Sequence, residues 1–336
     1  MKSNILISAC ILFCMIGFGQ QNQSQNKTSL KLNVLQITSV QWDDATGIPY
    51  QQLPGANFGA TSFEIIDNTT TAFLCNGTNQ IIITNNTNGK AIKTFNVAFA
   101  PRDFVYDNGL FYVLTEFKVS VYNQNGKEVN TFTFPTTYLG VERLTRHNNA
   151  TYLLLPSGNS LEIENNGKSI YPSELAGTIT AKGHLVLTKI NENNSYSIKL
   201  TSNNNQTYEQ TYTSTKKVAG VFVIGATANR LILDVQTFVS ENPITVERHI
   251  VSINITQNGL QQIVSSTKVP DCYYVLSNKD FYVAPTGTIY NMVTAPAGVF
   301  VFSLSELNTD TITDYPSDLT SIKYHFNDHL IQVDTK

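Results

Sequence analysis

The sequence predicts an all-β protein, and three observations support this. Short segments of alternating apolar and polar residues, rich in Val, Ile, Phe, Tyr and Thr, fill most of the chain, for example residues 111–123, 151–164 and 289–304. Asn-Gly pairs recur beside such segments, in "TNGKAIKTF", "QNGKEVNTF", "NNGKSIYP" and "QNGLQQIV". No stretch after residue 20 has the spacing of a long amphipathic helix.

A unit of four strands is clearest between Asp103 and Phe134. Four strand-like runs, "DFVY", "LFYVLT", "KVSVYN" and "EVNTFTF", are separated by "DNG", "EF" and "QNGK". Asn-Gly suits a two-residue hairpin because both central residues need a positive φ angle. If the strands are lettered A to D in chain order, the recurring Asn-Gly turn is expected between strands C and D.

The unit repeats along the chain. Successive A strands start 37 to 42 residues apart, except for one step of 59 residues that holds an extended hairpin at 238–249 and a separate segment at 269–278. A four-stranded period of about 40 to 45 residues is typical of β-propeller blades. The candidate starts are Phe63, Asp103, Glu142, Ile179, Val221, Asp280 and Thr320.

These starts predict seven blades and a particular closure of the ring. The blade that begins near residue 320 has chain left for only two strands, whereas the N-terminal strand at about 28–41 has no A strand before it. Joining both ends in one blade would remove exposed sheet edges. Six blades, with one start out of phase near the insertions, is the alternative.

The chain resembles the β-propeller superfamily, loosely in the manner of NHL and YncE-like proteins. "PRDFVYDNGLFYVLTEFKVSVYNQNGKEV" and "DFYVAPTGTIYNMVTAPAGVFVFSL" carry this resemblance through their rhythm of strands and Gly-containing turns. The blades lack the Trp-Asp ending of WD40 repeats, because the one Trp-Asp pair stands outside any repeating position. The resemblance implies an architecture and no specific activity.

The first residues read as a secretory signal peptide. Residues 1–19 combine Lys2 with a short apolar stretch, and a cut before about Gln20 would leave a single propeller domain at 20–336 in a secreted or periplasmic protein. No later stretch is long and apolar enough to cross a membrane. Cys75 and Cys272 then remain; they fall in different blades and are expected to be buried free thiols, although an oxidising compartment leaves pairing open.

Composition excludes one class of partner. Charged residues make up 14% of the chain, the formal net charge is −3, and no basic run occurs. We therefore expect no nucleic-acid partner. A monomer without a cofactor is expected.

The resemblance implies where a ligand would bind. In propellers the D-to-A connections and the B-to-C turns share one face at the mouth of the central channel. Arg102 and Arg143 could grip a carboxylate or sulfate there, or could instead form salt bridges that tie one blade to the next. The candidate ligand-binding residues are Arg102, Asp103, Glu142, Arg143, Asp271 and Asp318.

No catalytic set or metal site is predicted. The histidines form no metal-like cluster, those at 147 and 184 being expected in exposed turns on the opposite face, and no Gly-X-Ser-X-Gly elbow occurs. A hydrolase would need two facing carboxylates from the candidate set. Loop aromatics could instead stack on a ligand; they are Trp42, Tyr50, Phe58, Tyr138, Tyr273 and Tyr274.

The function predicted from these features is a secreted, non-catalytic binding module that presents loops to a glycan or a protein. Whether the protein is an enzyme stays open, with the balance against it. Two alternatives remain: a carbohydrate-active lyase or hydrolase with its site at the channel mouth, and a structural component of an envelope or secretion assembly.

Overall fold

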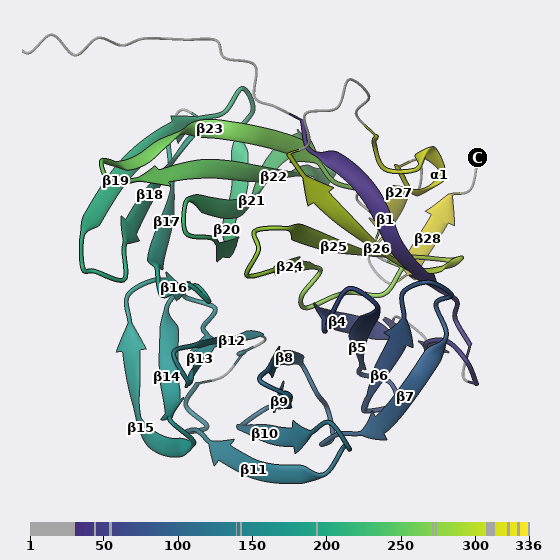
Figure 1. The fold of residues 1–336 in the computed structure, drawn as a ribbon. Coiled ribbons are helices and arrows are strands. Elements are labelled where there is room, and N and C mark those ends of the chain that lie inside the picture. Colours follow the sequence, from purple (N-terminus) through teal and green to yellow (C-terminus); the bar gives the residue numbers. More distant parts are fainter. Residues whose placement is uncertain are drawn as a thin grey trace, which may run out of the picture.

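Six four-stranded antiparallel sheets surround a central axis in the computed structural model, so the chain is a six-bladed β-propeller (Figure 1). One four-residue helix is the only helix among the described residues. The structure describes residues 31–43, 45–53, 56–138, 140–141, 143–192, 194–270, 272, 274–306, 313–320, 323–327 and 330–334. The expected signal peptide, Glu142, Asp271 and Tyr273 lie outside these residues.

Each of the first five blades is one continuous stretch of chain, with strands A to D in order from the inside outward. Blade 1 contains β4 (Ala60–Ile65), β5 (Thr70–Cys75), β6 (Gln80–Asn85) and β7 (Ala91–Asn96). Blade 2 contains β8 (Asp103–Asp107), β9 (Leu110–Leu114), β10 (Lys118–Asn123) and β11 (Glu128–Thr133). Blade 3 contains β12 (Arg143–His147), β13 (Ala150–Leu154), β14 (Ser160–Asn165) and β15 (Lys168–Leu175).

Blades 4 and 5 follow, and blade 5 has the longest strands of the ring. Blade 4 contains β16 (Thr178–Ile179), β17 (Leu185–Asn191), β18 (Ser195–Thr201) and β19 (Thr207–Thr213). Blade 5 contains β20 (Val218–Ala226), β21 (Arg230–Glu241), β22 (Ile244–Thr256) and β23 (Gly259–Lys268). The long hairpin of β21 and β22 is the extension that the sequence predicts at 238–249.

Blade 6 closes the ring with the N-terminal strand. Its inner strands are β24 (Phe281–Val283), β25 (Ile289–Ala295) and β26 (Gly298–Ser305), and its outer strand is β1 (Asn33–Val40), which pairs with β26. The N-terminal strand therefore takes the predicted outer position. Strands from both ends of the chain thus form one sheet, and β1 covers the edge of β26 that would otherwise be exposed.

The prediction of seven blades was wrong, and the six-blade alternative matches. No blade begins near residue 320: α1 (Ser317–Thr320) lies there, and β27 (Lys323–Asn327) and β28 (Leu330–Asp334) form a separate two-stranded sheet. The spacing of 40 residues from Asp280 imitated a blade, but the blade at 281–305 has no D strand of its own and takes β1 instead.

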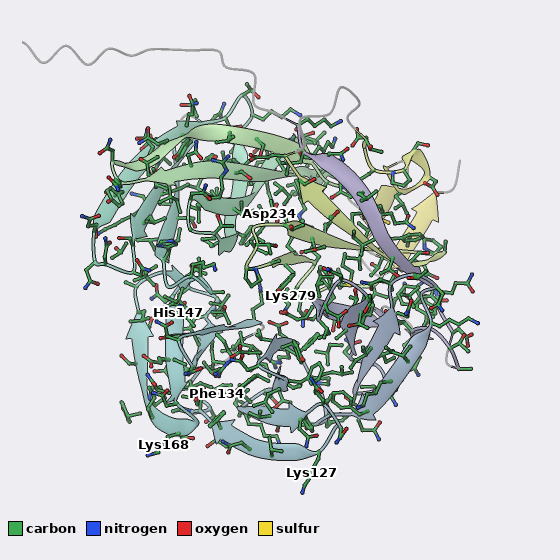
Figure 2. The ribbon with its side chains drawn as sticks, viewed as in Figure 1. Lys127, Phe134, His147, Lys168, Asp234 and Lys279 are labelled. Atoms are coloured by element: carbon green, nitrogen blue, oxygen red, sulfur yellow. The ribbon has the colours of Figure 1, made fainter. Side chains whose placement is uncertain are left out.

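The Asn-Gly turns join strands C and D, as predicted. Gly89, Gly126, Gly167 and Gly259 all have positive φ angles and lie between the third and fourth strands of blades 1, 2, 3 and 5. Figure 2 shows Lys127 and Lys168, which follow two of these glycines, at the outer margin of the ring. The repeated motif therefore marks the rim and is remote from the central axis.

The core lies between neighbouring blades. Phe95 of blade 1 packs against Phe111 of blade 2 with ring centroids 5.2 Å apart, and Phe104 and Tyr122 belong to the same buried cluster.

Cys75 and Cys272 are both buried and free. No helix among the described residues has the length and apolar character needed to span a bilayer.

Two inserted segments cross one face of the ring. The hairpin of β2 (Gln51–Leu53) and β3 (Ala56–Phe58) lies in the connection from blade 6 to blade 1. Residues 269–280 connect blade 5 to blade 6, and Asn278 and Lys279 both donate their backbone N–H groups to the carbonyl of Thr61 in β4. This segment brings Lys279 to the middle of the ring (Figure 2).

Candidate functional site

A buried ionic cluster joins three blades at the axis. Lys279 Nζ lies 2.7 Å from Glu64 Oε1 in β4 and 3.2 Å from Asp103 Oδ1 in β8, and it also donates to the carbonyl of Phe104. Ser62 Oγ donates to Asp103 at 2.6 Å, and the Leu144 N–H of blade 3 donates to its other oxygen at 3.0 Å. Because every partner is buried and bonded, this cluster holds blades together.

Two further buried arginines connect blades in the same way. Arg146 of blade 3 binds Asp107 of blade 2 at 2.9 Å and Glu164 at 2.8 Å. Arg248 of blade 5 binds Asp234 at 2.7 Å and reaches Asp280, just before blade 6, at 2.6 Å. Salt bridges therefore do tie one blade to the next, but they are formed by Arg146, Arg248 and Lys279 and not by the expected Arg102 and Arg143.

Burial raises the pKa of Glu64 to about 7, although the ammonium group of Lys279 opposes this shift. The nearby Asp103 and Asp107 act in the same direction as burial. Glu64 also lines the central cavity described next. One wall of that cavity therefore carries a carboxyl group whose pKa is near neutrality.

A central cavity of about 520 Å³ runs along the axis. The A strands of blades 1, 2, 3, 5 and 6 and residues 178–182 of blade 4 line it, together with A-to-B turn residues such as Asn108, Asn148 and Pro285. The two-residue β16 is the shortest of the A strands, which leaves room beside blade 3. The cavity therefore reaches the face of the A-to-B turns, opposite the face that the sequence favoured.

A second hollow, a groove of about 410 Å³, lies on the predicted face. It is built from three D-to-A connections and one B-to-C turn, because its lining comes from residues 51–58, 76–79, 99–102 and 278. Phe99 is 84% exposed in this groove and Leu53 is 43% exposed. We call this hollow the Arg102 groove; it is lined by Gln51, Leu53, Phe58, Asn76, Gly77, Asn79, Phe99, Ala100, Pro101, Arg102 and Asn278.

The candidate residues from the sequence are spread over several places. Arg102 lines the groove, where Nη1 donates to the Val141 carbonyl at 2.9 Å and Nη2 lies 3.9 Å from Glu116. Arg143 lines the central cavity, and Asp103 is fully buried in the ionic cluster. Asp318 is exposed in α1, at the outer edge of the ring (Figure 1). The described candidates therefore do not form one site.

Three of the loop aromatics meet beside the groove. Tyr50 stacks on Tyr274 with centroids 5.1 Å apart, and Trp42 lies 5.3 Å from Tyr50 while its Nε1 donates to the Ala295 carbonyl at 2.8 Å. The Asn57 amide donates to the Tyr274 carbonyl at 2.8 Å, which ties β3 to this cluster. These rings are half-buried against one another and support the loops that carry the groove.

Sequence reasoning missed Glu64, Lys279 and Phe99. Glu64 is a charged residue inside the apolar run "TSFEII", and Lys279 and Asp280 precede Phe281 as Arg102 and Asp103 precede Phe104. Both signals are local. The partners that explain them come from other blades, which the repeat alone does not specify.

The histidines provide no metal centre among the described residues. His147 Nδ1 lies 3.0 Å from the Ala181 carbonyl. His184 was expected to be exposed but is buried, and that burial lowers its pKa. Both lie at the A-to-B turns, as predicted.

Comparisons with known proteins assign the chain to no specific family. No family model matches the sequence, and no curated protein matches it. Among solved structures, streptogramin B lyase is 13% identical, covering 81% of this chain and 98% of its own, with a TM-score of 0.44. The Neurospora crassa Pan2 WD40 domain is 10% identical, with coverages of 84% and 98% and a TM-score of 0.49. Kuenenia stuttgartiensis hydrazine synthase is 14% identical, with coverages of 73% and 75% and a TM-score of 0.47. At these identities the likeness concerns the fold alone.

Proposed function

We propose that the protein is a secreted, non-catalytic binding module whose Arg102 groove takes an acidic glycan. The observation that carries this proposal is the composition of the groove. Exposed apolar side chains, amide groups and one arginine line a single hollow on the face where three D-to-A connections meet. Ligand sites commonly combine apolar walls with a few polar groups that fix orientation.

The amides suit a ligand rich in hydroxyl groups. Asn79 Oδ1 accepts from the Ala100 N–H at 3.0 Å, and Asn278 Nδ2 donates to the Arg102 carbonyl at 2.7 Å. Among the described residues, no partner takes the Asn79 amide nitrogen or the Asn278 amide oxygen. A donor and an acceptor are thus left for sugar hydroxyls, while Phe99 and Phe58 offer ring surface for the apolar face of a sugar.

Arg102 favours an acidic sugar over a neutral one. Its guanidinium uses Nη1 for the Val141 carbonyl, and its carboxylate neighbour Glu116 is 3.9 Å away with a side chain that is 58% exposed. A pair this long and exposed contributes little. A uronate carboxylate could therefore form a shorter, charge-assisted bond with Arg102.

Two features support this function over the alternatives. A hydrolase needs two carboxylates facing a sugar bond, whereas, of the candidate carboxylates that the structure describes, Asp103 is buried in a structural cluster and Asp318 lies at the outer edge of the ring. The leader-like residues 1–19 support secretion. No described feature favours an envelope assembly, and failure of both sugar probes in the test below would leave a protein as the ligand.

Binding of oligogalacturonate, compared with neutral xylo-oligosaccharide, tests the proposal by isothermal titration calorimetry. The wild type should bind the acidic probe more tightly. Phe99→Ala should weaken binding about tenfold, because truncating a central aromatic contact costs about 1 to 2 kcal/mol. Arg102→Gln should weaken binding of the acidic probe and remove the preference for it.

Matched controls separate this site from general effects. Tyr171→Ala removes an aromatic ring that is 93% exposed in β15 and far from the groove lining, so it should leave the affinity unchanged. Arg102→Lys keeps the charge and should fall between wild type and Arg102→Gln. The proposal is wrong if neither probe binds, or if Phe99→Ala and Tyr171→Ala behave alike.

A further inference from the structure

The central cavity has an unequal balance of charge. Four basic side chains line it, whereas the lining carboxylates are those of Glu64 and Asp107. Glu64 is paired with Lys279 and Asp107 with Arg146, so both carboxylates are already engaged. The remaining basic residues, Arg143 and Lys182, form no ion pair with any described residue. Lys279 and Arg146 also pair with Asp103 and Glu164 behind the lining. The unpaired positive charge at the cavity wall is therefore that of Arg143 and Lys182.

Arg143 is the feature that most needs an explanation. Its Nε is buried and has no hydrogen-bond partner among the described residues. On the same strand, Arg146 has three polar partners, namely Asp107, Thr151 and Glu164. Arg143 as a whole is half-buried, but a buried N–H group without an acceptor costs free energy, so an anionic oxygen in the cavity would offset that cost.

Arg143 lies at the end of the cavity that is farther from the A-to-B turns. Arg143 begins β12, whereas His147 ends it beside the A-to-B turn. Four residues of strand span roughly 13 Å. Lys182 lies in the A-to-B turn of blade 4, at the mouth. An anionic group would bind at Arg143, and Lys182 would raise the rate of its entry.

The remaining walls suit an organic body. Val223 and Ile224 of β20 and Phe281 and Val283 of β24 face the same space. A volume of about 520 Å³ lies within the range of small-molecule sites. A bare inorganic ion would leave most of this space and its apolar wall unused.

We propose that the central cavity binds a small organic anion, a carboxylate or phosphate monoester with an apolar body, through Arg143. This site is separate from the Arg102 groove, since the two hollows share no lining residue. The proposal therefore stands or falls independently of glycan binding.

The first experiment needs no ligand and compares two arginines of one strand. In thermal unfolding of the protein alone, Arg143→Gln should leave Tm unchanged or raise it, because it removes a half-buried charge that has no ion-pair partner among the described residues. Arg146→Gln should lower Tm by roughly 6 °C or more, since it breaks a buried ion pair. A loss of Tm in Arg143→Gln as large as in Arg146→Gln would show a structural role and overturn the proposal.

The second experiment measures binding of 4-phenylbutyrate and phenyl phosphate against uncharged 4-phenylbutanol by calorimetry. At least one anion should bind at least tenfold more tightly than the alcohol, and which one binds distinguishes a carboxylate from a phosphate source. Arg143→Gln should lose this preference, and Arg143→Lys should keep part of it. Lys127→Gln removes a rim charge (Figure 2) and should change nothing.

Three results would overturn the proposal. The first is that neither anion binds with a Kd of about 1 mM or tighter. The second is that the alcohol binds as tightly as the anions. The third is that Arg143→Gln leaves anion binding intact. Slower association in Lys182→Gln, with a weaker dependence on salt, would further support entry past the A-to-B turns.

Discussion

At the scale of residues, chemistry could be assigned from the sequence only where its partners are local. Asp103 was expected at a solvent-filled mouth, but Ser62 of blade 1, Leu144 of blade 3 and Lys279 from the connection before blade 6 enclose it. The repeat predicted that Asp103 starts an A strand, which it does. It could not predict the radial depth of the carboxylate, because that depth depends on neighbouring blades. Arg102 does lie on the predicted face of the D-to-A connections, because its own connection is short and its position depends only on the adjoining strands.

Glu64 predicts a specific dependence of stability on pH. Its pKa of about 7 in the folded state exceeds the ordinary value of 4.5, so the folded protein binds more protons between these pH values. The stabilisation from this group is complete below pH 4.5 and is lost as pH rises to about 7. In urea unfolding, the wild-type stability minus that of Glu64→Gln should fall by roughly 2 to 3 kcal/mol from pH 5 to pH 8.

Glu116→Gln, in an exposed turn, controls for the loss of one carboxylate in these measurements. A wild-type advantage that instead grows with pH would mean that Lys279 keeps Glu64 charged and that the assignment is wrong.

At the scale of elements, hairpins were predictable because their signals lie within a few residues. Asn-Gly pairs placed the C-to-D turns, and alternation placed most strands. The two-residue β16 was not foreseen, although it makes room for the central cavity. The alternation of residues 178–184 gives no indication of so short a strand.

Two glycines in equivalent turns separate backbone strain from crowding. Gly126 has a φ of 75° and Gly167 a φ of 79°. A Cβ on Gly126 would lie 2.4 Å from Cβ of Phe95, whereas nothing lies within 4 Å of one on Gly167. Gly167→Ala should cost about 1 kcal/mol of unfolding free energy from strain alone. Gly126→Ala should cost about 1 to 3 kcal/mol more through overpacking, as measured by urea unfolding. Equal losses would show that Phe95 moves away freely.

At the scale of the whole molecule, the period predicted a propeller but not its number of blades. A spacing of 40 residues after Asp280 suggested a further blade, although residues 317–320 are helical and β1 supplies the missing outer strand. Pairing between residues 33–40 and 299–305 is the most distant strand contact in the ring, so a local period could not specify it. Closure nevertheless fixes the face on which residues 51–58 and 278 meet Arg102.

The central claim is that this face binds an acidic glycan in the Arg102 groove. Hydrogen–deuterium exchange with and without saturating oligogalacturonate tests it most directly, because exchange reports each segment separately. We expect slower exchange in β2, β3, residues 76–79 and residues 97–102, with the A-to-B turns unchanged. Protection confined to the A-to-B turns, such as residues 147–149, or no protection at all, would contradict the account.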